Sequence, residues 1–488
     1  MSVGAVAAAA VSRFSALSYG KIVGSNGNIR VGVIGFNGRG NAHIDAYRKI
    51  DGVELVALCD ADETVLEKGY ARVTKGQSLR APEPEPTASA PRIQKYNDLR
   101  KLLDNKDVDV ISTATPNHWH SLITVWSCQA GKDVYVEKPV SHDIWEGRKS
   151  VEAARKYSRI VQAGTQNRSN PVVREAVEWV KKGNLGKILI GRAVIYNRRS
   201  SIGKVAAAPA IPPGVNLDLW CGPSPLEAPR REHFHYDWHW FWETGNGEIA
   251  NNGVHEIDIV RWAMDKNTLS NNVLSVGGRF GYDDDGQTPN TQFAIHDYGD
   301  SLMIMEVRGL PSKPGNPKVD TYKTQGVGWV LECENGYLAG TTAYDKKDVA
   351  IRKFEADGEG KKRMQQDHFA NFIDAVRSRK ASDLHADIED GHLSTSLCHM
   401  PNISYRLGRK CDPEAIKAAV KSDPAALETF ERFAQHLASN EIDLSIDKAV
   451  LGLPLTMDPK TERFIDNEAG NRMLKRVYRA AFRVPESV

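Results

Sequence analysis

The stretch Ile29-Arg-Val-Gly-Val-Ile-Gly35-Phe-Asn-Gly-Arg-Gly40 decides the fold. Ile29 to Ile34 is a short apolar run typical of a buried parallel strand, and a glycine-rich turn ends it. We expect a helix over residues 41–50 and a second apolar strand over residues 53–59, ending at Asp60. Strand, glycine turn, helix and strand make a βαβ unit, which predicts an α/β domain with a doubly wound parallel sheet.

The glycine turn has the layout of a dinucleotide-binding turn. There the first glycine permits a tight bend, the second lets the backbone approach the pyrophosphate, and the third lets the helix pack against the strand. Gly35 and Gly40 fill the first and third places, while Asn37 takes the second with Gly38 beside it. Asn tolerates left-handed backbone angles better than most residues, so the turn stays feasible. The predicted cofactor residues here are Gly35, Phe36, Asn37, Gly38, Arg39 and Gly40.

Asp60 gives this turn a context that an ordinary tight turn lacks. It follows the second strand, 20 residues after Gly40. A carboxylate at that place can accept hydrogen bonds from the adenosine ribose hydroxyls and repels a 2′-phosphate. The alternative is a turn aspartate at a strand end. With all parts in register, the pattern predicts dinucleotide binding, with NAD preferred over NADP.

The rest of the chain divides into regions that differ in the expected order of helices and strands. After a Pro-rich stretch over residues 69–92, expected as an exposed loop, strands and helices alternate to about residue 164. Beyond about residue 173 strands follow one another with few helices, which favours a largely antiparallel sheet. We expect a Rossmann domain over residues 29–170, an α+β domain over residues 171–410 closed by a helix over residues 367–379, and a C-terminal extension over residues 411–488.

Composition excludes several classes of protein. The 488 residues hold 64 Lys and Arg against 62 Asp and Glu, so the basic footprint of a nucleic-acid binder is missing. No apolar run approaches the ~20 residues of a membrane span. Six cysteines without Cys-x-x-Cys spacing indicate buried free thiols rather than a zinc or redox site.

The first 28 residues contain no Asp or Glu and begin with an Ala/Val run, Ala5 to Val11. This is typical of the apolar part of an export signal, although the basic segment that should precede it is missing. We expect either an export-signal remnant, which places the protein in the periplasm, or a disordered extension of a cytoplasmic protein. In both cases residues 1–28 stand outside the fold.

Val136-Glu-Lys-Pro139 follows a predicted strand. A lysine there lies on the edge where doubly wound sheets bind ligands, and Lys138 could hold a carbinol oxygen as negative charge develops on it. Pro139 would fix the loop, and a cis peptide is one way to do so. The alternative is a solvated loop lysine.

A polar stripe precedes an apolar helix that runs to Met264. Asn251, His255 and Asp258 fall at i, i+4 and i+7 of Gly247-Glu-Ile-Ala-Asn-Asn-Gly-Val-His-Glu-Ile-Asp258, on one helical face. A histidine held by a polar neighbour is a suitable general base near neutral pH. A lone helical histidine is otherwise a structural residue.

Aromatic and histidine residues gather over residues 220–242. Aromatic faces interleaved with hydrogen-bonding groups suit the apolar face and hydroxyl rim of a sugar. Three histidines also permit a zinc site, but no Glu stands as in a His-Glu-x-x-His helix, so we predict no metal. A plain aromatic core segment is the third interpretation. The predicted sugar-binding residues are Trp220, His235, Trp238 and His239, with His255.

Together, the glycine turn, Asp60, Glu137-Lys138-Pro139 and the run from Gly253 to Asp258 resemble the Gfo/Idh/MocA family of sugar oxidoreductases. The match runs in order from about residue 29 to 409, and Glu-Lys-Pro is its most specific marker. The Ala-rich start resembles the signals of a secreted branch, without their twin arginine. The resemblance implies a Rossmann domain, a C-terminal domain with a large open sheet, NAD(P) in the cleft between them, and homodimers or homotetramers formed through that sheet.

The resemblance also assigns roles to single residues. Lys138 matches the catalytic lysine and His255 the catalytic histidine, while Gln166 and Arg168 lie in a stretch that lines the nicotinamide side, Arg168 toward the substrate. The residues that match the cofactor loops are Thr115, Pro116, Asn117, His118 and Glu137.

One position departs from the family pattern. Where the family carries an Asp four residues before the histidine, this chain has Asn251, which can orient an imidazole but cannot stabilise imidazolium by charge. Asp258 is either the replacement carboxylate or a structural residue.

The sequence thus predicts an NAD-dependent oxidoreductase that moves hydride between a sugar hydroxyl carbon and nicotinamide. The alternatives are an NAD-dependent glycoside hydrolase, acting by transient C3 oxidation and elimination, and a non-catalytic nucleotide-binding protein. Intact Lys138 and His255 argue against the last.

Overall fold

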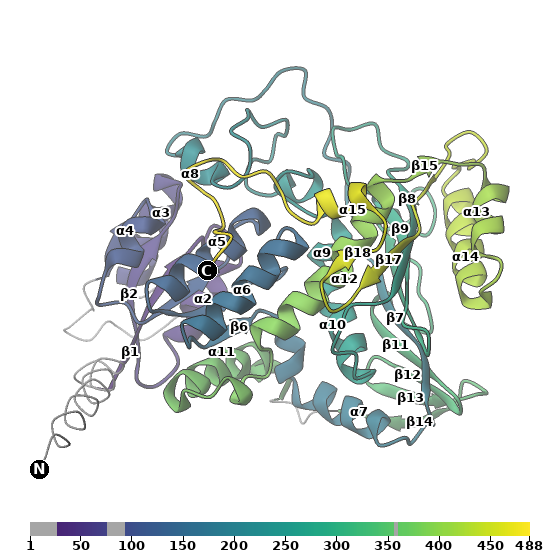
Figure 1. Cartoon of the computed structure of the whole chain (residues 1–488), viewed down its shortest axis with the longest axis horizontal. Coiled ribbons are helices and arrows are strands. Elements are labelled where there is room, and N and C mark those ends of the chain that lie inside the picture. The colour runs from purple at the N-terminus through teal and green to yellow at the C-terminus, as the bar shows by residue number, and fades with distance from the viewer. Residues whose placement is uncertain (1–26, 76–92, 356–359) are drawn as a thin grey trace, which may run out of the picture.

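A six-stranded parallel sheet forms the N-terminal domain of the computed structural model, which describes residues 27–75, 93–355 and 360–488 (Figure 1). The strands run in the order β3-β2-β1-β4-β5-β6, the Rossmann order. They are β1 (Ile29–Ile34), β2 (Val53–Cys59), β3 (Gln94–Tyr96), β4 (Val110–Thr113), β5 (Asp133–Val136) and β6 (Val161–Ala163). Both faces of the sheet are covered, which explains the continuous apolar runs. The expected fold class of this domain is confirmed.

Five helices connect these strands: α2 (Gly40–Tyr47), α3 (Glu63–Thr74), α4 (Leu99–Asp104), α5 (Asn117–Gln129) and α6 (Ile144–Lys156). One expectation needs correction. Asp62 caps α3 by accepting from the N–H groups of Thr64 and Val65, and the helix then continues to Thr74, so it includes the start of the expected loop. Helix α4 begins at Leu99, where Asp98 caps it, and Tyr96 belongs to β3. The remainder of that loop, residues 76–92, lies outside the described residues.

The second sheet has twelve strands. Its main path runs β14-β13-β12-β11-β7-β10-β9-β8-β16-β15, and only β7 with β10 pair in parallel, so the expected mostly antiparallel sheet is confirmed. The strands are β7 (Ile188–Tyr196), β8 (Asn272–Gly278), β9 (Thr291–Asp297), β10 (Leu302–Arg308), β11 (Val327–Cys333), β12 (Gly336–Ala339), β13 (Thr342–Asp345), β14 (Ala350–Lys353), β15 (Arg409–Lys410), β16 (Val450–Leu451), β17 (Leu455–Asp458) and β18 (Arg463–Phe464).

Helices between the two sheets join the domains. They are η1 (Gln166–Ser169), α7 (Pro171–Lys181), α9 (Glu248–Asn251), α10 (Gly253–Ala263) and α12 (Ile388–Arg406), and α12 contacts both α6 and β8. The helix expected to close the second domain is α11 (Gly360–Ser378), and it packs on the Rossmann sheet instead, followed by η3 (Ala381–Asp383). The reason is its aromatic face: Phe369 stacks on Tyr135 of β5, with ring centroids 4.4 Å apart.

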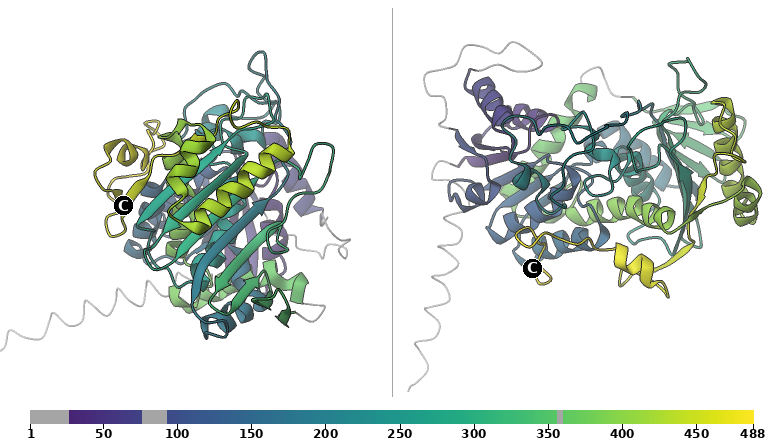
Figure 2. Two further views of the ribbon diagram at one scale, coloured as in Figure 1. Left: turned by 90° about the vertical axis from the view of Figure 1, so that its right-hand side faces the viewer. Right: turned by 90° about the horizontal axis from the view of Figure 1, so that it is seen from above.

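The outer face of the large sheet is partly covered by the chain itself. Helices α13 (Pro413–Val420) and α14 (Pro424–Ser439) lie across it (Figure 2, left). Phe433 packs against Phe293 of β9, while Arg432 forms an ion pair with the buried Glu306 of β10. This covering is part of the C-terminal extension.

Two long segments return to the Rossmann domain. Residues 197–246, with α8 (Leu217–Cys221) and η2 (Asp237–Trp240), pass over the top of Figure 1 from the large sheet, and we call them the lid. After α15 (Glu468–Met473), residues 474–488 run back across α5 and α6. There Phe482 meets the ring of Trp119, and Arg479 donates to the backbone carbonyls of Asp218 and Gly222 in the lid. The end of the chain therefore binds the Rossmann domain and the lid together.

All six cysteines are buried and free, as predicted. Among the described residues, no helix has the length and apolarity to cross a bilayer.

We expect Phe482→Ala to lower the free energy of unfolding by about 3–5 kcal/mol, because it removes a buried ring from a packed cluster. Chemical denaturation followed by circular dichroism measures this. The exposed neighbour Arg483→Ala serves as the matched control and should change stability by no more than about 0.5 kcal/mol. Equal effects of the two substitutions would contradict the packing described here.

Candidate active site

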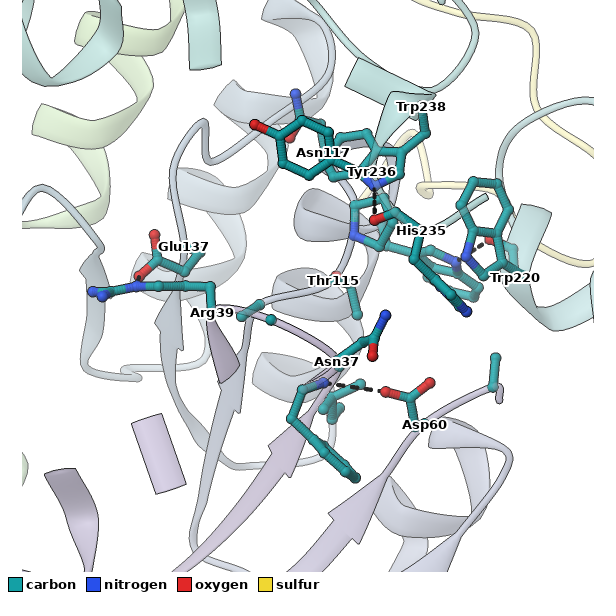
Figure 3. A pocket seen from close by; sticks show the side chains of 18 of the residues that line it. Asn37, Arg39, Asp60, Thr115, Asn117, Glu137, Trp220, His235, Tyr236 and Trp238 are labelled. Atoms are coloured by element: carbon teal, nitrogen blue, oxygen red, sulfur yellow. Dashed lines mark hydrogen bonds and ion pairs between the residues drawn. The ribbon is translucent and has the colours of Figure 1, made fainter. Parts of the chain in front are cut away.

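A cavity of about 750 Å³ lies at the carboxyl edge of the Rossmann sheet, under the lid (Figure 3). Its floor comes from the ends of β1, β2, β4 and β5, where the strand order reverses, and its roof from the lid. The predicted residues that line it are Gly35, Phe36, Asn37, Gly38, Arg39, Asp60, Thr115, Pro116, Asn117, Glu137, Lys138, Trp220, His235, Trp238, His239 and Asn251. The fold thus gathers residues more than 200 positions apart around one cavity.

The glycine turn fits a dinucleotide backbone. Gly35 has φ +74°, and a Cβ on it would lie 2.8 Å from Thr115 Cγ2. A Cβ on Gly40 would lie 2.1 Å from the Gly35 carbonyl oxygen, so α2 can pack this close only with glycine there. A Cβ on Gly38 would meet nothing within 4 Å, which leaves its side of the turn open to the cavity. Asn37 does not adopt a positive φ, so its tolerance of left-handed angles is not needed.

Asp60 is held at the end of β2 by the backbone. Its carboxylate accepts hydrogen bonds from the N–H of Phe36 at 3.1 Å and the N–H of Asp62 at 3.0 Å. Burial raises the pKa of Asp60 to about 6. The Asp60 carboxyl group therefore lines the cavity, and its pKa lies close to physiological pH.

Glu137 is buried behind the turn and ties three elements together. Its Oε1 accepts from Arg39 Nε at 2.8 Å and Gln166 Nε2 at 3.0 Å, and lies 3.1 Å from His43 Nε2. Burial alone would raise the pKa of Glu137, but the charge of Arg39 and the hydrogen bond to His43 hold it well below its ordinary value. Figure 3 shows the Arg39–Glu137 pair at the cavity wall.

Lys138 and Asn251 meet across the two domains. The Lys138 ammonium donates to the backbone carbonyl of Asn251 at 2.8 Å, and the peptide bond from Lys138 to Pro139 is cis. Burial lowers the pKa of Lys138, although the charge of Glu137 opposes this. An ammonium has three donors, so two N–H groups remain for another acceptor.

His255 lies in the first turn of α10. Burial, and then the positive charge of Lys138, lower the pKa of His255 to about 3, so the imidazole is neutral at neutral pH. Asn251 does not orient this ring, because its side-chain amide donates to Glu248 at 3.2 Å. Asp258 does not supply a carboxylate either, since it is fully buried against Arg168.

The lid residues serve both the cavity and a small aromatic core. Trp220, Phe234 and Trp238 pack together, and His239 stacks on Trp238 with ring centroids 3.6 Å apart. His235 Nε2 lies 2.9 Å from Asp62 Oδ2, which fastens the lid to the cap of α3. The histidines of the lid bind different partners, and among the described residues no three His, Cys, Asp or Glu side chains are grouped to hold a metal ion.

Five predicted residues lie outside the cavity lining: Gly40, His118, Gln166, Arg168 and His255. The Arg168 guanidinium, predicted to face the substrate, forms a two-point ion pair with Asp258, at 2.7 and 3.0 Å. His118 Nε2 lies 3.0 Å from the Trp220 carbonyl oxygen, which ties α5 to the lid. Gln166 donates to Glu137 and acts through it.

Sequence reasoning missed Tyr236, which lines the cavity, and the pair Glu248 and Arg199 behind it. Tyr236 lies in the aromatic run over residues 220–242, so the argument that selected Trp238 could also have selected Tyr236. Nothing in the spacing of Arg199 and Glu248 relates them, because the start of the lid and α9 meet only in the folded chain.

Two family models match this chain, one over the first sheet and one over part of the second. Residues 29–165 match the NAD-binding Rossmann-fold model of an oxidoreductase family, and residues 170–300 match the model of that family's C-terminal α/β domain. A glycosyl hydrolase family 109 protein of Shewanella pealeana is 30% identical over 177 residues, 36% of each chain. An α-N-acetylgalactosaminidase of Shewanella oneidensis is 28% identical over 170 residues, 34% of each chain. The chain thus matches about a third of the length of these relatives.

Solved structures share the fold. The WlbA dehydrogenase of Bordetella pertussis, crystallised with NADH and UDP-GlcNAcA, superposes with a TM-score of 0.55 at 18% identity, covering 78% of this chain and 97% of that one. Myo-inositol 2-dehydrogenase of Lactobacillus plantarum gives a TM-score of 0.53 at 17% identity, covering 77% and 96%. At these identities the likeness concerns the fold.

We expect the affinity for NADH to rise with pH through about 6, since the pKa of Asp60 lies there and only the ionised carboxylate can accept from two ribose hydroxyls. Affinity should be about tenfold weaker at pH 5 than at pH 8, measured by fluorescence titration. Asp60→Asn should bind weakly at every pH and discriminate less against NADPH. An unchanged pH profile in this variant, or tighter binding of NADPH by the native protein, would contradict the assignment.

Proposed function

Because the chain belongs to the Gfo/Idh/MocA oxidoreductase family, we propose that it is an NAD-dependent sugar oxidoreductase. The observation that supports this most is one cavity lined both by the glycine turn with Asp60 and by the Lys138 ammonium, which bonds to the Asn251 carbonyl. A nucleotide-binding protein without catalysis does not need a half-buried lysine whose charge keeps a nearby histidine neutral.

The cavity residues fit the cofactor. The open side of Gly38 and the start of α2 would receive the pyrophosphate, Asp60 the adenosine ribose, and the loop from Thr115 to Asn117 the part toward Lys138. Bound NAD would supply the hydride acceptor for the oxidised carbon. The Asp60 carboxylate would repel a 2′-phosphate, which favours NAD over NADP.

Two side chains divide the remaining chemistry. Lys138 holds the substrate oxygen with its remaining N–H groups and stabilises the negative charge that develops there. His255 is neutral and takes the hydroxyl proton as a general base. Burial and the charge of Lys138 lower the pKa of His255, so the imidazole would release the proton readily after accepting it.

The substrate is proposed to be a carbohydrate. Trp220, Trp238, His235 and His239 line the roof of the cavity, where rings offer apolar faces and the imidazoles offer hydrogen bonds. Tyr236 adds a further ring to this wall.

A second candidate is an NAD-dependent glycoside hydrolase. The relatives named glycosyl hydrolase family 109 favour it. In this route oxidation at C3 acidifies the proton on C2, the glycosidic bond breaks by elimination, and water and hydride return. Lys138 and His255 would serve both routes, because both begin by removing hydride and a hydroxyl proton.

Location and assembly are further parts of the proposal. The acid-free, Ala-rich residues 1–28 support export to the periplasm. A homodimer or homotetramer through the large sheet would use strands β11 to β14, because α13 and α14 cover part of the outer face. The mass of the purified protein by light scattering, and the N-terminal residue of the protein recovered from cells, test these two points.

We expect Lys138→Ala and His255→Ala each to reduce the rate by about 10²–10⁴-fold while NAD still binds, because each removes a group needed for charge or proton transfer. Fixed-time assays measure the rate of sugar turnover, and fluorescence titration measures the binding of the cofactor. A variant that keeps its rate would remove that residue from the mechanism.

The two routes differ in the fate of the hydride. Incubation with NAD and a panel of free sugars and aryl glycosides, with absorbance of NADH and release of aglycone followed together, distinguishes them. We expect NADH in step with oxidised sugar and no aglycone. Aglycone without accumulation of NADH would replace the oxidoreductase by the hydrolase.

A further inference from the structure

We propose that the ion pair of the buried Glu248 and the half-buried Arg199 positions the reaction centre and adjusts the charge of Lys138. In naming Lys138 as the centre, this inference rests on the proposed function. The pair stands outside the cavity lining, so both residues act through others.

The Glu248 carboxylate accepts five hydrogen bonds from four side chains. Its side chain is 2% exposed, and both oxygens accept from the Arg199 guanidinium, Nη2 at 2.9 Å and Nε at 3.1 Å. It also accepts from the side-chain amides of Asn197 at 3.1 Å, Asn251 at 3.2 Å and Asn252. Both oxygens of this carboxylate therefore hold parts of the segment after β7 and of the α9–α10 corner.

The contact with Asn251 connects the pair to the lysine. Glu248 holds the Asn251 side chain while the backbone carbonyl of the same residue accepts from Lys138 Nζ at 2.8 Å. The carboxylate that the family pattern would place at position 251 thus stands three residues earlier in this chain. It reaches Lys138 through Asn251 rather than reaching His255.

Arg199, near the start of the lid, connects the pair to the lid residues that line the cavity. Its Nη1 donates to the Tyr236 hydroxyl at 2.9 Å, and His239 Nδ1 lies 2.5 Å from the Tyr236 carbonyl oxygen. Both lid residues line the cavity. One ion pair therefore fixes the position of the α9–α10 corner and of the proposed sugar wall relative to each other.

The charges around Lys138 make the proposal testable. The acids that face it are Glu137 and Glu248, which raise its pKa, and the bases are Arg39 and Arg199, which lower it. The imidazoles of His120, His239 and His255 also feel its charge. Removing Glu248 or Arg199 should move the ionisation of Lys138 in opposite directions, whereas simple loosening of the structure would move it the same way in both.

The experiment measures the ionisation of Lys138 directly, without substrate. Trace acetylation with acetic anhydride between pH 6 and 10, read by mass spectrometry of the peptide that contains Lys138, gives its pKa. We expect Glu248→Gln to lower this pKa by about one unit and Arg199→Met to raise it by about one unit. The double variant should return close to the native value. Shifts in the same direction, or no shift, overturn the proposal.

Two controls separate charge from geometry. Glu243→Gln removes a mostly exposed carboxylate from the same lid and should leave the Lys138 profile unchanged. Arg199→Lys keeps the charge but loses the two-point contact, so the pKa should hold while the rate of sugar turnover falls about tenfold. If a single variant does not fold, the double variant and Arg199→Lys still decide, because a moved Lys138 pKa in either one contradicts the proposal. Absence of sugar turnover in the native protein would reject the proposed function, while the acetylation result would stand.

Discussion

The site depends on the hydrogen bonds and positive charge that stabilise one buried carboxylate, that of Glu137. Glu137 follows β5 inside the protein, where an unpaired negative charge would be costly. Its partners are Arg39 from the glycine turn, His43 from α2 and Gln166 from η1. Because Lys138 is the next residue, satisfying Glu137 also fixes the backbone that carries the lysine. The cofactor turn and the reactive ammonium are therefore parts of one electrostatic unit.

Local patterns were enough to predict the Rossmann half and its cavity floor. The turn from Gly35 to Gly40 and Asp60 lie close in sequence, and their spacing already determines their geometry. Local patterns could not predict the partner of Arg168, because Asp258 comes from another helix, and a buried guanidinium requires a charged partner. The same applies to α11, whose aromatic face packs on a sheet formed more than 200 residues earlier.

Asn251 shows how the chemistry of a site can move along the chain. In the sequence it looked like a lost carboxylate beside His255. In the structure its amide turns to Glu248, and its carbonyl, a group every residue has, contacts Lys138. Side-chain identity at a single position could not reveal this, because the replacement acid is paired with Arg199 on a separate strand exit. The electrostatic result is a neutral His255 imidazole near the half-buried Lys138 ammonium.

The segment that carries Phe482 has a consequence for the folding rate of the nucleotide-binding half. One face of the first sheet is covered by α11. On the other face, Phe482 and Val484 join a core that also contains residues of β4, β5, α5 and α6. Both segments are distant in sequence from the strands, so these contacts close long loops before they add stability. Contacts of high sequence separation slow folding, and the core of this half is completed by contacts of that kind.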